Sequence, residues 1–153
     1  MLRKNCSLIF GIILLLCSSC NLNTFQKTSV PEFSIENLSY KKTDEQYAEL
    51  PEGVYFDFCN QSEKKVLFVE AKLNLFDLQT QSSADSAPGT ITCCFDVSIP
   101  VSEKKDFCIP VQVHAVSPSD ILVDSFYISR IYYSEGSVWF DLFGSYAIQG
   151  GRN

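Results

Sequence analysis

Every second residue between positions 67 and 75 is apolar, and most residues between them are polar. The apolar set is Leu67, Val69, Ala71, Leu73 and Leu75. Side chains of a β-strand alternate between its two faces, whereas side chains of a helix recur with a period of 3.6 residues. The pattern therefore predicts a long strand with one face in a core and excludes an amphipathic helix.

Similar runs of β-branched and aromatic residues follow one another along the chain. They predict strands over residues 33–40, 53–60, 67–75, 91–99, 107–115, 121–133 and 137–147. The alternation breaks at Leu38. Pro110 predicts an edge strand or a bulge, because proline has no backbone donor for a sheet. We expect a turn at residues 134–136 to join the last two strands as a hairpin.

These strands occupy residues 32–147 without a linker or a repeat that would divide them. With 153 residues, 46% of them hydrophobic, the chain can bury one modest core. The expected fold is an all-β, antiparallel sandwich of about seven strands. A closed lipocalin-like barrel would need more chain. Residues 148–153 are expected to form a disordered tail.

The N-terminal residues have the pattern of an export signal. Arg3 and Lys4 precede an uncharged apolar run over residues 8–16. A transmembrane helix needs about 20 apolar residues, so this run is too short to span a bilayer comfortably. We expect residues 1–19 to be a signal helix that is removed by cleavage.

The end of this signal resembles a bacterial lipobox, because the small residues Ser18 and Ser19 are followed directly by Cys20. The resemblance implies that Cys20 becomes the first mature residue, carries diacylglycerol on its sulfur and is acylated on its new amino group. Residues 20–31 would then be a flexible tether. Cys17 stands where the pattern usually has Leu, Val or Ile, so cleavage before Cys17 and an ordinary secretory signal are the alternatives.

The expected location is a bacterial cell envelope, with the protein anchored to a membrane by lipid. The chain has 12 basic and 18 acidic residues, which excludes the basic surface that nucleic acid requires. Loss of Arg3 and Lys4 with the signal would leave 10 basic residues against 18 acidic ones, a net charge of −8. Such a body is repelled by anionic lipid, so we expect it to stand away from the bilayer on its tether.

Three segments resemble the FxLYD domains. The segment Leu73–Asp77 is similar to the motif that names the family, and Phe58–Ser62 is similar to a strand of the family that ends in an Asn-containing turn. Residues that resemble the closing hairpin of the family are Ile128, Ile131, Tyr133, Gly136, Ser137 and Trp139. The resemblance covers residues 53–145 and implies an immunoglobulin-like, noncatalytic module for adhesion or scaffolding. It names no ligand, and we expect an envelope protein of unknown identity as the partner.

No pattern in the sequence predicts catalysis. His114 is the only histidine, and the chain lacks the GxSxG, HExxH, P-loop and GxGxxG motifs. We therefore expect His114 to be a solvated surface residue, and we expect no enzyme activity, no cofactor and no metal site. The alternative, an enzyme, would need a polar cluster around His114.

Four of the 7 cysteines remain once Cys6 and Cys17 leave with the signal and Cys20 is lipidated: Cys59, Cys93, Cys94 and Cys108. An exported protein can form disulfides, and four thiols allow three complete pairings. Cys94 and Cys108 are the first candidates for a bridge, because both are expected to face outward on consecutive strands. Cys93 is expected to face the core.

The predicted C-terminal hairpin is rich in aromatic residues. Rigid aromatic side chains often anchor protein partners, so Trp139, Tyr132 and Tyr133 are candidate partner contacts. Packing into the core and along an edge strand is the alternative for these residues. The function expected from the sequence is a noncatalytic protein-binding or scaffolding module. An apolar small-ligand carrier with a pocket between its sheets is the alternative.

Overall fold

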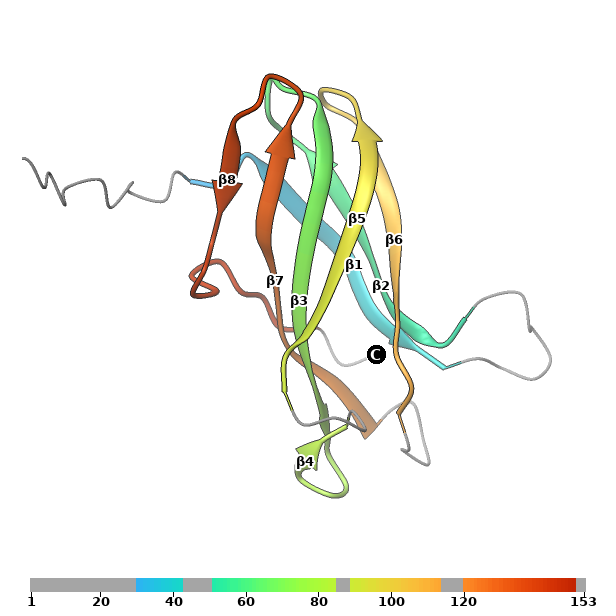
Figure 1. The fold of residues 1–153 in the computed structure, drawn as a ribbon. Helices are drawn as coiled ribbons and strands as arrows, with labels where there is room; N and C mark the ends of the chain where they lie inside the picture. The colour runs from blue at the N-terminus through green and yellow to red at the C-terminus, as the bar shows by residue number, and fades with distance from the viewer. Residues whose placement is uncertain (1–29, 43–50, 85–88, 114–119, 151–153) are drawn as a thin grey trace, which may run out of the picture.

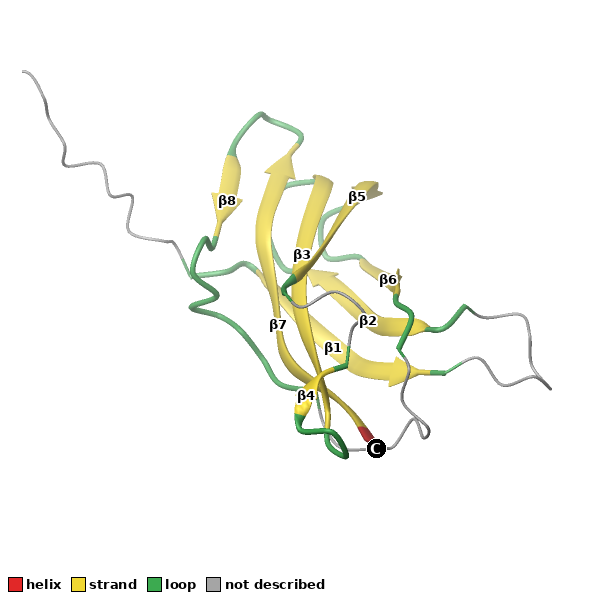
Figure 2. Cartoon of the chain, turned by 60° about the horizontal axis from the view of Figure 1, so that its bottom comes forward, coloured by secondary structure: helices red, strands yellow, loops and turns green. Residues whose placement is uncertain are grey.

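The computed structural model describes residues 30–42, 51–84, 89–113 and 120–150, which form two antiparallel sheets packed face to face (Figure 1). The strands are β1 (Phe33–Lys41), β2 (Gly53–Asn60), β3 (Val66–Asp77), β4 (Ser82–Ser83), β5 (Ile91–Ile99), β6 (Lys104–Pro110), β7 (Ile121–Tyr133) and β8 (Val138–Phe140). The predicted all-β sandwich is confirmed, and the described residues contain no α-helix. The short red segment in Figure 2, directly before β7, is a 3₁₀ turn at Asp120. The predicted signal helix lies outside the described residues.

The three-stranded sheet has the order β1-β2-β6. In the five-stranded sheet the order is β4-β3-β7-β8, and β5 pairs with β3 beside β4. The consecutive strands β5 and β6 thus belong to different sheets of the sandwich, with β5 on the sheet of β3. The two-residue strand β4 is additional to the seven strands expected, and it lies between those expected over residues 67–75 and 91–99.

The alternation in β3 holds from Val69 onward but not before it. Val66 is fully buried, whereas Leu67 is 41% exposed, so the expectation that Leu67 faces the core is wrong. The register of β3 against both β5 and β7 shifts between Val66 and Phe68. This irregularity reverses the phase, because one additional residue moves every following side chain to the other face.

A similar irregularity explains the break in alternation near the N-terminal end of the domain. The pairing of β1 with β2 shifts between Glu36 and Ser39, and Asn37 has a φ of 53°. Asparagine tolerates this left-handed conformation better than most residues. The break at Leu38 therefore corresponds to a bulge in an edge strand.

The predicted bounds of two strands are wrong by several residues. β6 begins at Lys104 and ends at Pro110, although the next alternating residues, Val111 and Val113, are still buried. Pro110 closes an edge strand, as expected. β8 ends at Phe140, seven residues before the predicted end.

The chain leaves the sheet after Phe140 and returns to β7 at Ile148. Phe126 and Ile148 exchange two backbone hydrogen bonds of 2.9 and 2.8 Å, and the amide of Gly150 donates to the carbonyl of Val123 at 2.9 Å. The expectation of a disordered tail from residue 148 is therefore wrong for residues 148–150. Residues 141–147 thus form a loop at the edge beside β7, between β8 and the isolated pairing of Ile148.

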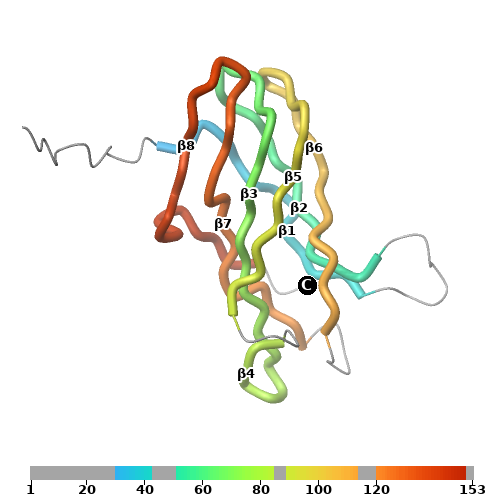
Figure 3. The backbone as a smooth tube through the Cα atoms, in the orientation of Figure 1, coloured from blue at the N-terminus to red at the C-terminus, as the bar shows by residue number. Residues whose placement is uncertain are grey.

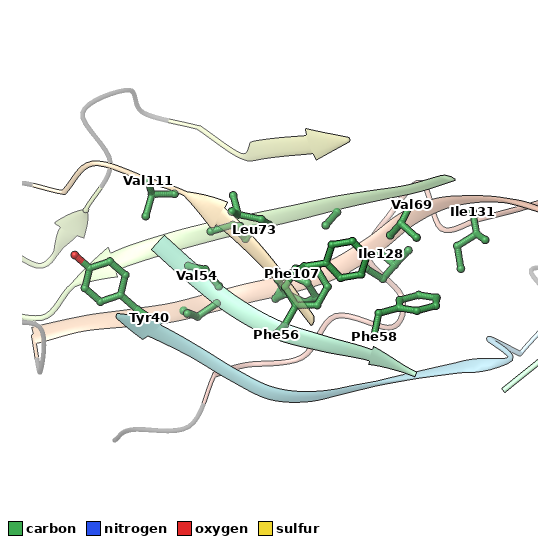
Figure 4. Packing of buried hydrophobic residues seen from close by; sticks show 14 of the residues in the cluster. Tyr40, Val54, Phe56, Phe58, Val69, Leu73, Phe107, Val111, Ile128 and Ile131 are labelled. Atoms are coloured by element: carbon green, nitrogen blue, oxygen red, sulfur yellow. The ribbon is translucent and has the colours of Figure 1, made fainter. Parts of the chain in front are cut away.

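Phe56 of β2 lies at the centre of the core, between the two sheets (Figure 4). Its ring centroid is 4.7 Å from that of Phe126 in β7 and 5.2 Å from that of Phe107 in β6. Phe95 of β5 joins the cluster at 4.6 Å from Phe107. These rings connect four strands from both sheets, and their burial supplies much of the hydrophobic stabilisation.

Asn60, at the end of β2, is a buried polar residue that connects the two sheets. Its Nδ2 donates to the carbonyls of Lys64 and Pro100, at 2.8 and 2.9 Å, and its Oδ1 accepts from the Ser62 hydroxyl at 2.7 Å. Lys64 lies in the turn between β2 and β3, and Pro100 lies in the turn between β5 and β6. One side chain thus joins two turns that are far apart in the sequence.

Candidate binding site

Two of the three aromatic residues predicted to contact a partner are buried. Trp139 is 6% exposed and Tyr133 is 7% exposed. The Trp139 ring packs edge-on against Phe33 at 5.1 Å and so connects β8 to β1 across the sandwich. The expectation that Trp139 and Tyr133 are partner contacts is therefore wrong, because their rings belong to the core.

Tyr132 is 38% exposed on the outer face of the five-stranded sheet. Its ring packs against Phe68 at 5.2 Å, and its hydroxyl accepts a hydrogen bond of 3.4 Å from Arg130. Arg130 also lies 3.7 Å from the carboxylate of Glu70. Tyr132 is thus the accessible member of the predicted set, and its hydroxyl is bonded to a charged side chain of its own sheet.

The most exposed large apolar side chains of this end of the chain lie in the excursion after β8. Phe143 is 86% exposed and Leu142 is 58% exposed, and Tyr146 and Ile148 are also exposed. Exposed apolar residues that gather in one place mark interaction sites more often than single ones do. We name residues 142–148 the apolar turn.

Buried Asp141 holds the apolar turn in its shape. Its carboxylate accepts hydrogen bonds from the amides of Phe143 and Tyr146, at 3.3 and 2.9 Å. Gly144 has a φ of 67°, and a Cβ at this position would lie 3.3 Å from the Tyr127 ring. A residue other than glycine would therefore be strained there. These contacts make Phe143 project from a defined backbone.

An open apolar groove with a volume of about 440 Å³ adjoins the turn. It lies between β1 of one sheet and β7 of the other, and the apolar turn forms its third side. The lining residues are Pro31, Phe33, Ser34, Ile35, Phe126, Tyr127, Ile128, Tyr146, Ala147 and Ile148. None of these side chains carries a charge, although the chain as a whole is strongly acidic. The groove lies at an edge of the sandwich, because the phenylalanine cluster fills the centre of the sandwich.

The four described cysteines are all free. Cys94 lies on β5, which pairs with β3, and Cys108 lies on β6, which pairs with β2. The two consecutive strands therefore belong to different sheets, and their outward side chains point from opposite outer faces. This placement does not support the predicted bridge between Cys94 and Cys108.

Two of the described cysteines, Cys59 and Cys93, also lack the lowered pKa of a reactive thiol. Burial raises the pKa of the Cys59 and Cys93 thiols, whereas a nucleophilic cysteine has a lowered pKa. Cys93 is half-buried against the core, as expected. Among the described residues no group of three or more His, Cys, Asp or Glu side chains is placed to hold a metal ion.

Two predicted features cannot be placed. His114 and Cys20 both lie outside the described residues. The described part of the chain contains no helical segment with the length and apolarity of a membrane span.

No known protein family, no curated protein and no solved structure was found that matches this chain. The resemblance of Leu73–Asp77 to the FxLYD motif therefore stays a prediction. The apolar turn and its groove are the strongest candidate for a binding site in the described residues.

Proposed function

We propose that this chain is a lipoprotein of a bacterial cell envelope, and that its β-sandwich is a noncatalytic module that binds another envelope protein. The sequence Ser18-Ser19-Cys20 after an apolar run of nine residues supports the anchor. Lipid on Cys20 would hold the mature protein at a membrane without a span, because two or three acyl chains give stable attachment. A tether over residues 20–31 would allow a reach of roughly 40 Å.

Phe143 is the observation that carries the binding proposal. An aromatic side chain that is 86% exposed, on a backbone held by a buried carboxylate, is a preorganised anchor. The uncharged groove beside it suits an apolar segment of a partner protein. We propose that such a segment inserts its side chains between β1 and β7 while Phe143 enters a pocket of the partner.

An apolar small molecule in the groove is the second candidate function. The volume of about 440 Å³ is within the range of small-molecule sites, and no charged side chain lines it. Phe143 distinguishes the two functions, because it contacts a protein partner in the first and does not line the groove. Replacement of Phe143 would therefore weaken protein binding and leave binding of a small ligand unchanged.

Crosslinking on intact cells tests the binding function. A photoreactive residue at position 142 should form an adduct with one envelope protein, and Phe143→Ser should lower its yield at least about tenfold. Leu67→Ser is the matched control, because Leu67 is also an exposed apolar residue but lies away from the turn. An equal loss in both variants, or no adduct, would contradict the proposed surface.

The lipid anchor has its own test. Cys20→Ser should abolish incorporation of labelled fatty acid and release the protein from membranes into the soluble fraction. Cys17→Ser is the control and should leave both unchanged. If the Cys20→Ser protein is retained by membranes as well as the unaltered chain, the anchor proposal is wrong.

A further inference from the structure

Apart from the two-residue β4, four strands lie at the edges of the two sheets: β1, β6, β8 and β5. The first three carry features that hinder pairing with another strand. The bulge at Asn37 interrupts β1, and β8 has only three residues. β6 carries Lys104, Lys105 and Pro110. Charges, proline, bulges and short strands are the usual means by which proteins block such edges.

The fourth edge, β5, carries fewer of these features: one charged residue, Asp96, and one shift of register against β3. Its nine residues contain no lysine, arginine, proline or glycine, and in the described part of the chain β5 pairs only with β3. The shift of register against β3 leaves its alternation intact, since every second side chain of β5 faces inward from Ile91 to Ile99. The outer row of backbone donors and acceptors can therefore receive another strand.

The order of residues in β5 is self-complementary about its central residue, Phe95. An antiparallel second copy with its two-fold axis at Phe95 would face all nine residues with inward opposite inward and outward opposite outward. The opposed pairs would be Ile91 with Ile99, Thr92 with Ser98, Cys93 with Val97, and Cys94 with Asp96. A two-fold interface requires this kind of self-complementarity, because each surface contacts a copy of itself.

Charge and burial agree with this register. Asp96 is the only charged residue of β5 and would lie opposite Cys94, so the two Asp96 residues are not directly opposite each other. Thr opposite Ser is a favourable cross-strand pair. The inward side chains Cys93, Phe95 and Val97 pack against the core yet are only half-buried, and neighbours from a second copy would cover them.

We infer that two copies of this chain associate through antiparallel pairing of β5 with β5, which joins their five-stranded sheets into one continuous sheet. β5 and β6 form one flank of the sandwich, whereas β8 and the apolar turn form the other (Figure 3). The association therefore leaves the groove and Phe143 accessible, and it does not depend on the proposed function.

Disulfide trapping in membranes from cells that produce the full chain tests the pairing. Asp96→Cys places a thiol opposite the native Cys94 of the second copy, so mild oxidation should give a product of twice the mass on a non-reducing gel. The unaltered chain has no cysteine pair across the axis and should give none. Cys94→Ser combined with Asp96→Cys should remove the product.

A pair of charge variants in the Asp96→Cys background tests the register and controls for folding. In the proposed pairing, position 92 of one copy lies opposite position 98 of the other. Thr92→Glu with Ser98→Glu places like charges opposite each other, whereas Thr92→Glu with Ser98→Lys places opposite charges there. In both variants the glutamate at position 92 lies beside Lys72 of its own β3, so the local cost is shared.

We expect the yield of trapped dimer to fall at least about fivefold with two glutamates and to be retained with the Glu and Lys pair. Equal yields from the two variants, or a monomer alone after oxidation of the Asp96→Cys chain, would overturn the inference. A product of another mass would also overturn it, because β5 would then pair with a strand of a different protein.

Discussion

The carboxylate of Asp141 accepts a hydrogen bond of 2.9 Å from the backbone amide of Tyr146, five residues further along the chain. Asp141 is buried, and its other oxygen accepts from the amide of Phe143. One side chain thus closes the apolar turn at both ends and directs Leu142 and Phe143 into solvent. The most exposed part of the candidate site depends on one of the most buried polar groups.

Asp141→Ala should destabilise the protein by about 1–3 kcal/mol, because the backbone amides of Phe143 and Tyr146 lose their acceptor. Asp141→Asn retains one acceptor oxygen and should cost less. Urea unfolding measures the loss of stability, and amide hydrogen exchange at residues 142–148 should show the turn opening first. Unchanged exchange in Asp141→Ala would show that other contacts hold the turn.

Replacement by alanine should lower the unfolding free energy strongly at Trp139 and hardly at all at Phe143. Trp139→Ala removes a buried ring that packs against Phe33 and should cost about 3–5 kcal/mol of unfolding free energy. Phe143→Ala removes an exposed ring and should change stability by less than about 0.5 kcal/mol. Urea midpoints of the two variants compare them directly. A stable Trp139→Ala protein would contradict the packing described for β8.

Asn60→Ala should cost about 2–4 kcal/mol, because the carbonyls of Lys64 and Pro100 lose a buried donor and Ser62 loses its acceptor. Thermal unfolding measures this effect. Gln61→Ala is the control, because Gln61 is exposed and its side chain bonds only to the Ser34 hydroxyl among the described contacts. The prediction fails if both variants unfold at the same temperature.

Asp57 makes stability depend on pH. Its carboxylate lies 2.7 Å from Nζ of Lys104 and accepts a bond of 2.6 Å from Asn37, and these two contacts lower its pKa, the lysine most. A carboxylate with a lowered folded-state pKa stabilises the protein above its unfolded pKa of about 4 and loses this contribution as pH falls through the folded value.

The unaltered protein should therefore lose more stability between pH 6 and acidic conditions than Asp57→Asn does. Urea midpoints measured for both proteins along an acid series test this difference. Parallel curves would show that Asp57 contributes nothing to the pH dependence. Glu135 should act in the same direction, because a hydrogen bond from Ser137 and a weaker effect of Lys64 lower its pKa to about 2. The variant Glu135→Gln measures how much Glu135 contributes to the pH dependence of stability.

Most strands could be predicted from the sequence, because alternation is a local property that any half-buried strand must have. The predictions failed where the backbone departs from regular pairing. Leu67 faces solvent because of the irregularity beside Val66, and the last strand ends at Phe140 because the chain loops out around Asp141. Alternation in the sequence does not reveal where a strand contains a bulge or where the chain leaves the sheet.

The candidate site was predicted only in part. The concentration of aromatic residues over residues 126–143 made Trp139 a candidate partner contact, with packing into the core as the alternative. The burial of Trp139 depends on Phe33, which is more than 100 residues away in the chain and lies across the sandwich. Contacts of that kind are set by the packing of two sheets.

The sequence alone thus determined that the domain is all-β within the described residues, where most strands lie and which of their faces is apolar. These features follow from neighbouring residues and the geometry of one strand. The tertiary structure decided which strands pair, which edge is left open and which aromatic rings are exposed. These features depend on non-local contacts, and strands with similar alternation could satisfy many pairings equally well until side chains of both sheets pack together.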